Sequence, residues 1–105
     1  AINYQFTTGI KDEEIIPNVL NVFDAYPNPF NPTTSIRIQS NSILPSITLS
    51  IFNVNGQLIQ TLQKKAENSH RIDIKWDGSQ NSSGVYFIKV DWSAGSRTQK
   101  ITLLN

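Results

Sequence analysis

The stretch Tyr26-Pro27-Asn28-Pro29-Phe30-Asn31-Pro32-Thr33-Thr34 decides where the folded domain begins. Its three prolines lack backbone N–H donors and hold φ near about −65°, so neither a helix nor a central strand can run through it. The residue before each proline is also biased towards extended backbone. The following residues, Ser35-Ile36-Arg37-Ile38-Gln39-Ser40, alternate polar and apolar side chains as a half-buried strand does. A stiff aromatic segment followed at once by a strand predicts the opening of an all-β domain.

Similar alternating runs continue to the end of the chain, separated by turn signals. Beyond residues 35–40, strands are predicted around residues 46–51, 57–63, 71–76, 84–92 and 97–104, with a further strand around 22–25. Asn55-Gly56 lies between two of these runs and is typical of a two-residue type I′ hairpin turn. No segment keeps the period of an amphipathic helix. Short strands at this spacing predict an immunoglobulin-like antiparallel β-sandwich of about seven strands, over residues 22–105.

The same alternation predicts which side chains form the core. On the longest predicted strand, Tyr86, Ile88, Val90 and Trp92 share one face. The last strand turns Ile101 and Leu103 inward, and Ile72, Ile74 and Trp76 share a face on residues 71–76. Tyr86 is also a candidate for fixing a corner through its hydroxyl group.

Composition excludes several classes of function. The 105 residues carry nine basic and eight acidic side chains, and this net charge of +1 argues against nucleic-acid binding. No apolar run approaches the ~18 residues of a transmembrane segment. Without cysteine, neither a disulfide nor a thiolate metal site can form. Because methionine is also absent, we expect a fragment or a processed form, in which residues 1–21 are a linker or the tail of an upstream domain.

Side chains capable of catalysis are few and scattered. His70 is the only histidine, and its position at the start of a polar strand favours an exposed structural role. Asp73 and Asp77 are predicted to face solvent, opposite Trp76, and not to flank a cleft as glycosidase carboxylates do. The cluster Asp12-Glu13-Glu14 is interpreted as part of a solvated linker and not as a metal site. No catalytic residue, cofactor or metal is therefore predicted.

Two tryptophans leave a second function open. Trp76 and Trp92 could form a platform for stacking sugar rings, as in a carbohydrate-binding module. Both fall in phase with inward-facing aliphatic residues, however, which favours packing in the core. A third alternative is a structural spacer or assembly domain.

Five blocks, in order, resemble the C-terminal sorting domain of the type IX secretion system, a family similar to the immunoglobulin-like domain of the flagellar hook-capping protein. The blocks are the proline-aromatic stretch with Ser35-Ile36-Arg37-Ile38, Ile51-Phe52-Asn53-Val54-Asn55-Gly56-Gln57, Trp76-Asp77-Gly78, Ser83-Gly84-Val85-Tyr86-Phe87 and Lys100-Ile101-Thr102-Leu103-Leu104. They span the chain from Phe23 onwards. The departures from the family pattern are Asn53, where aspartate is frequent, and the short loop 79–83.

The resemblance implies a non-catalytic domain that ends a cargo protein of a Bacteroidetes-type bacterium. Such a domain directs its N-terminally linked cargo through the periplasm to the type IX translocon, for release or display at the cell surface. A sortase-like peptidase is the second implied partner, and the domain itself is expected to be monomeric. The implied sorting-motif residues are Pro27, Asn28, Pro29, Phe30, Asn31, Pro32, Gly56, Gly84, Tyr86, Lys100, Ile101 and Leu103.

Two further expectations concern the cleavage region and the last strand. Cleavage requires an unstructured segment, and residues 9–21 are the stretch that fits before the domain, with Gly9, Lys11, Asp12 and Pro17 as the candidate cleavage region. The last strand ends almost at the last residue of the chain. We therefore expect that strand and the Lys100 region to be open to strand addition by a receptor.

Overall fold

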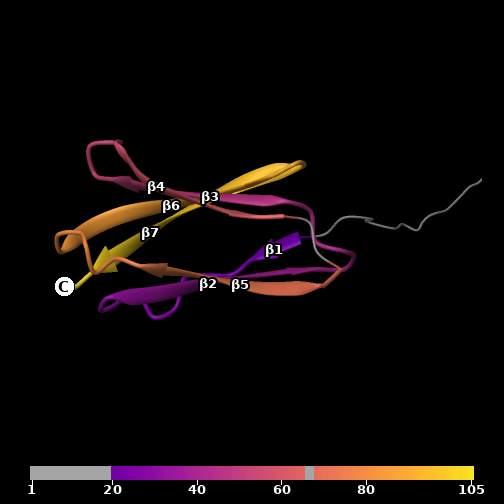
Figure 1. The fold of residues 1–105 in the computed structure, drawn as a ribbon, viewed down its shortest axis with the longest axis horizontal. Coiled ribbons are helices and arrows are strands. Elements are labelled where there is room, and N and C mark those ends of the chain that lie inside the picture. The colour runs from indigo at the N-terminus through magenta and orange to yellow at the C-terminus, as the bar shows by residue number, and fades with distance from the viewer. Residues whose placement is uncertain (1–19, 66–67) are drawn as a thin grey trace, which may run out of the picture.

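The computed structural model describes residues 20–65 and 68–105, which form two antiparallel sheets packed face to face (Figure 1). The smaller sheet has the order β1-β2-β5 and the larger sheet the order β4-β3-β6-β7. The strands are β1 (Leu20–Val22), β2 (Thr33–Ser40), β3 (Ile47–Asn53), β4 (Leu58–Lys64), β5 (Arg71–Asp77), β6 (Gly84–Trp92) and β7 (Gly95–Leu103). The predicted all-β sandwich of about seven strands is confirmed. The described residues include no helix of the length and apolarity that a membrane span requires.

Alternate residues of the two sheets meet in a single core, as the sequence pattern predicts. On β6, Tyr86, Ile88 and Val90 are buried, while Trp92 is half-buried at the border of the core. Trp76 lies at the centre of an aromatic cluster, with its ring centroid 5.6 Å from that of Phe30 and 5.6 Å from that of Tyr86. These tilted and edge-on contacts are the arrangements that aromatic rings prefer.

The first strand begins earlier than predicted. Leu20 pairs with Ser40 and Asn21 with Gln39, so β1 includes two residues that the sequence analysis assigned to the preceding segment. Its regular pairing ends at Val22, ahead of the predicted residues 23–25. Phe23 N still donates to Arg37 O at 2.9 Å, so the chain stays beside β2 for a short distance after β1 ends.

Between β1 and β2 the chain crosses from one sheet to the other and back. Tyr26 and Ser35 of β2 exchange two backbone hydrogen bonds, of 3.0 and 3.1 Å. Four residues later, Phe30 lies parallel to the end of β7: its N–H donates to Thr102 O at 2.9 Å, and its carbonyl accepts from Leu104 N at 2.8 Å. The proline-aromatic stretch therefore ties the two sheets together.

The β3–β4 hairpin has a three-residue loop in place of the predicted two-residue type I′ turn. The N–H of Gly56 donates to Asn53 O at 3.0 Å, which places Val54 and Asn55 at the centre of the turn. Gly56 follows with a φ of 78°, in the left-handed region that favours glycine. The Asn53 side-chain oxygen accepts from the N–H groups of Asn55 and Gln57, at 2.9 and 3.0 Å, and so stabilises the longer loop.

Phe30 and Tyr26 provide a matched test of this crossing segment, because Phe30 is 1% exposed and Tyr26 is 80% exposed. We expect Phe30→Ala to lower the free energy of unfolding by about 3–5 kcal/mol, since it leaves a cavity beside Trp76. Tyr26→Ala, in the same segment, should change it by about 0.5 kcal/mol or less. Urea denaturation followed by tryptophan fluorescence measures both. Equal losses would show that Phe30 is not a core residue.

Candidate functional site

The five sequence blocks gather at one end of the sandwich, on the left in Figure 1. Strand register brings them there: Thr33 lies opposite Asp77, Asn53 lies opposite Tyr86, and Gly84 lies opposite Leu103. The starts of β2 and β6 therefore adjoin the ends of β3, β5 and β7. We name this region the motif end, and define it by residues 26–33, 53–57, 76–84 and 100–105.

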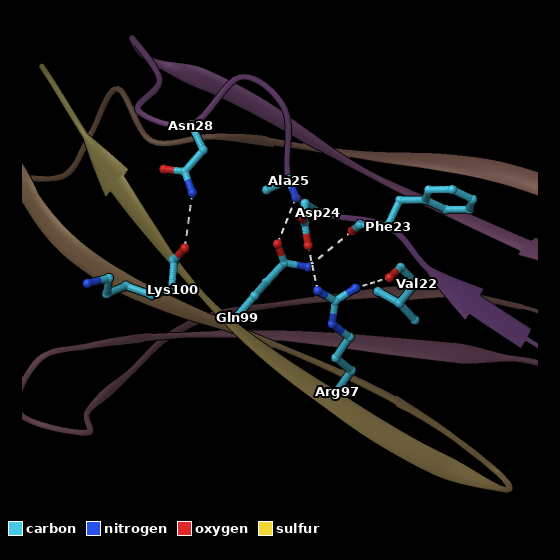
Figure 2. Close-up of polar contacts among 8 residues, drawn as sticks. All are labelled: Val22, Phe23, Asp24, Ala25, Asn28, Arg97, Gln99 and Lys100. Carbon is cyan, nitrogen blue, oxygen red and sulfur yellow. Dashed lines mark hydrogen bonds and ion pairs between the residues drawn. The ribbon is translucent and has the colours of Figure 1, made fainter.

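At the motif end, one asparagine side chain pairs with β7 as a neighbouring strand would. The Asn28 amide nitrogen donates to Lys100 O at 3.1 Å (Figure 2). Its amide oxygen accepts from Thr102 N at 3.0 Å. The flanking Pro27 and Pro29 have no N–H to offer β7. The residues between and after the prolines, Asn28 and Phe30, therefore supply the bonds to the strand.

Further along the same edge, side chains of β7 reach back to the segment that follows β1. The Gln99 amide accepts from Ala25 N at 2.7 Å and donates to Phe23 O at 3.2 Å (Figure 2). The Arg97 guanidinium donates to Val22 O and forms an ion pair with Asp24. Residues 22–30 thus lie beside β7 from Arg97 to its end, held by side chains at Arg97 and Gln99 and by bonds to the strand edge from Lys100 onwards.

These contacts correct the expectation that the last strand is open to a receptor. The outer edge of β7 is occupied from Lys100 to Leu104 by Asn28 and Phe30 of the same chain. The side chains of Gln99 and Arg97 hold the preceding residues beside the strand. A strand could add there only by displacing this segment. Lys100 itself presents an exposed side chain, although its carbonyl is engaged.

The last residue of the chain is held against the β5–β6 loop. Asn105 N donates to Ser83 Oγ at 2.7 Å, and the Asn105 side chain donates to Ser79 O and Asn81 O at 3.0 and 2.6 Å. In the same loop, the Tyr86 hydroxyl donates to the carbonyl of residue 82 at 2.7 Å, which confirms the predicted corner. The loop and the chain end therefore form one hydrogen-bonded unit.

The Trp-Asp-Gly block forms the corner that leads into this loop. A Cβ added at Gly78 would lie 3.1 Å from Leu103 Cδ2, so glycine permits the close approach of β7. Gly78 N also donates to Pro32 O at 2.8 Å, linking two blocks directly. The N–H and hydroxyl of Ser79 hydrogen-bond to the Asp77 carboxylate and lower the pKa of that group.

Outward-facing residues of three blocks and of β4 align in one row across the larger sheet. Phe52 lies opposite Leu58 of β4 on one side and Phe87 on the other, and Phe87 lies opposite Lys100. Leu58 is 59% exposed, the two phenylalanines are half-buried, and Lys100 is exposed. We name these four residues the outer row. The sequence did not reveal the row, because its alignment depends on the register of three separate strand pairs.

The predicted sorting-motif residues fall into two groups, one buried and one exposed or half-buried. Phe30, Tyr86, Ile101 and Leu103 are buried. The exposed or half-buried members are Pro27, Asn28, Pro29, Asn31, Pro32, Gly56, Gly84 and Lys100, all at the motif end. The candidate cleavage residues 9–17 and the acidic cluster 12–14 lie outside the described residues.

The two tryptophans do not form a shared sugar-stacking platform. Trp76 is 2% exposed, and its indole N–H donates to Gln60 Oε1 at 3.0 Å. It lies near the motif end, whereas Trp92 ends β6 at the opposite end, where it lines a small cavity of about 130 Å³. His70 is exposed. Within residues 20–65 and 68–105, no group of three or more histidine, aspartate or glutamate side chains is placed to hold a metal ion.

The contact between Gln99 and residues 23–25 can be tested by truncating the side chain. Gln99→Ala leaves the N–H of the buried Ala25 without its acceptor, and we expect the free energy of unfolding to fall by about 1–3 kcal/mol. Gln63→Ala, on the exposed part of β4, is the matched control and should be near neutral. Urea denaturation of both variants gives the comparison. Indistinguishable midpoints would mean that Gln99 does not hold the segment.

A titration tests the Asp77 corner. Ser79→Ala removes the hydroxyl donor but keeps the backbone N–H, so the pKa of Asp77 should rise yet remain below its ordinary value. Because this pKa is lower in the folded chain than in the unfolded chain, its stabilising effect is present above the unfolded pKa and is lost as pH falls through the folded one. NMR titration of the Asp77 carboxyl measures the shift. An unchanged pKa in the variant would exclude the hydroxyl contribution.

Comparison with known proteins agrees with this geometry. The model of the family described as "Secretion system C-terminal sorting domain" matches residues 24–103. The crystal structure of dimeric latent PorU from Porphyromonas gingivalis is similar over 91% of this chain, with a TM-score of 0.63 and 23% identity. The match covers 10% of the PorU chain, and at this identity the likeness shows the fold alone. No curated protein matches the sequence.

The family match covers all five blocks apart from Leu104, and with it the whole motif end except the last two residues. Domains of this family are C-terminal sorting signals for type IX secretion, which delivers proteins to the cell surface or the medium. As a family, these sorting-tail domains are non-catalytic signals. The chain belongs to the family of secretion-system C-terminal sorting domains.

Proposed function

We propose that this domain acts, without catalysis of its own, as the export address of a cargo protein joined to its N-terminal side. The supporting observation is the outer row, because it brings together outward-facing residues from separate family blocks: Phe52, Phe87 and Lys100. Core packing alone explains the buried members of those blocks. It does not explain why outward-facing apolar residues of separate blocks lie next to one another and to a lysine.

We further propose that the outer row contacts the type IX translocon. Half-buried phenylalanines beside an exposed lysine suit a protein surface that is mainly apolar and carries an acidic group near Lys100. The domain engages this partner as a monomer. A sortase-like peptidase would then cleave the chain before β1, within residues 9–19, to release the cargo or attach it to the surface.

Export of a reporter tests the proposal. The full 105 residues are fused behind a periplasmic reporter enzyme in a type IX-competent bacterium. We expect the reporter in the medium or on the cell surface, and in the periplasm when the translocon is inactivated. A reporter that remains periplasmic in the competent strain would refute the proposed function.

Point substitution is a sharper test than truncation, for a structural reason. Removing residues 100–105 would also remove Ile101 and Leu103, which are fully buried, together with the partners of Phe30. The fold would then be lost along with the signal. Lys100→Ala removes an exposed side chain that forms no hydrogen bond or ion pair with another described residue.

We expect Lys100→Ala to reduce the exported fraction several-fold, as the loss of about 1 kcal/mol of binding free energy would. Lys75 is also exposed, on β5, and Lys75→Ala should export like the parent chain. Thermal unfolding of both variants should match the parent chain, which separates recognition from folding. Equal export by the two variants would exclude a role for the Lys100 side chain.

A further inference from the structure

The four outer strands differ in how their edges are protected. The edge of β7 is bonded to Asn28 and Phe30 from Lys100 to Leu104, and β1 has only three residues. On β5, the residues whose backbone groups face outward are charged: Arg71, Asp73, Lys75 and Asp77. Charge, shortness and cover are the usual means by which proteins prevent unwanted strand pairing.

The edge of β4 has none of these protections over most of its length. Residues 58–63 contain neither a charged side chain nor a proline, and no other segment of the described chain pairs with their outer side. The irregularity in register at Ile59 is confined to the turn end, and residues 60–64 pair regularly with β3. β4 is therefore the long, uncharged open edge of the described sandwich.

Strand alternation shows which backbone groups of β4 are free. Asn53 N donates across the hairpin to Gln57 O, so the odd-numbered residues of β3 direct their backbone groups to β4. Ile51 and Leu49 then bond with Gln60 and Leu62, their register partners. The N–H and C=O groups of Thr61 and Gln63 consequently point away from the sheet.

We propose that β4 is a docking edge that receives an extended segment of a protein of the secretion machinery, as an added strand. This inference rests on the proposed function and identifies the edge that the partner uses. The added strand would hydrogen-bond to Thr61 and Gln63 and extend the larger sheet by one strand. Near the turn, its side chains would continue the outer row beyond Leu58, which is 59% exposed.

Charge defines the partner strand further. Lys64 and Lys65, at the far end of β4, are exposed and form no ion pair with another described residue. Residues 58–63 have no charged side chain with which a residue of the partner strand could pair. The complementary segment is therefore uncharged or apolar along its centre, with an acidic residue where it passes the two lysines.

Proline substitution tests the edge without breaking the sheet. Thr61→Pro removes an outward N–H, a position at which edge strands tolerate proline, and leaves the bonds between β3 and β4 in place. Lys75→Pro is the matched control on β5. Because the backbone groups of Ser35 bond to Tyr26, those of its neighbours Thr34 and Ile36 point to β5. The backbone groups of Lys75, the register partner of Ser35, therefore point outward. In the full reporter fusion, we expect Thr61→Pro to reduce export by about tenfold, since a bond is lost and the added strand meets the proline ring. Lys75→Pro should export normally.

The export results distinguish the docking edge from the sorting function. If the parent fusion is exported and Thr61→Pro is exported equally well, the docking edge is refuted while the sorting function stands. Circular dichroism and urea denaturation of the full chain confirm that each variant is folded. If Thr61→Pro does not fold, the double variant Thr61→Lys, Gln63→Lys blocks pairing by charge and must show the same export defect.

Crosslinking identifies the occupant. A photo-crosslinking amino acid at position 63 should capture a component of the secretion machinery in the exporting strain, and the same probe at position 75 should not. Capture at both positions would refute a specific edge. Capture of a second copy of this chain, with a dimer in sedimentation analysis, would replace the proposed partner by self-association and overturn the inference.

Discussion

The hydrogen bonding of residues 22–30 to β7 is the constraint on which the arrangement of the sandwich depends. It joins the two sheets, closes the edge of β7 from Lys100 to Leu104 and places Phe30 over Trp76. The alternation of prolines with bonding residues makes this pairing specific. Pro27, Pro29 and Pro32 cannot donate to a strand, so the contacts with β7 fall to Asn28 and Phe30.

Closing one side of the sandwich leaves the other side for recognition. With β7 covered and β5 charged, the uncharged edge of β4 and the outer row become the distinctive surfaces of the described chain. The buried and exposed members of the same sequence blocks then have separate roles. Phe30, Tyr86 and Leu103 stabilise the fold, while Phe52, Phe87 and Lys100 are presented on its surface.

Local pattern predicted β2 to β7 and most of their inner faces, but it placed the start of β1 two residues too late. Alternation in residues 84–92 is decisive because a half-buried strand must repeat every two residues, and Tyr86, Ile88 and Val90 are buried as predicted. The β3–β4 turn was mispredicted because the side chain of Asn53 stabilises a longer loop than Asn55-Gly56 would favour. The sequence pattern could not predict that the end of the β7 edge is bonded, because Asn28 and Thr102 come together only in the tertiary structure.

Native-state amide hydrogen exchange tests most directly whether β7 is closed while β4 is open. The amides of Thr102 and Leu104 bond to Asn28 and Phe30, whereas the amides of Thr61 and Gln63 face solvent. We predict strong protection of the first pair and rapid exchange of the second. Rapid exchange at Thr102 and Leu104 with protection at Thr61 and Gln63 would contradict the account.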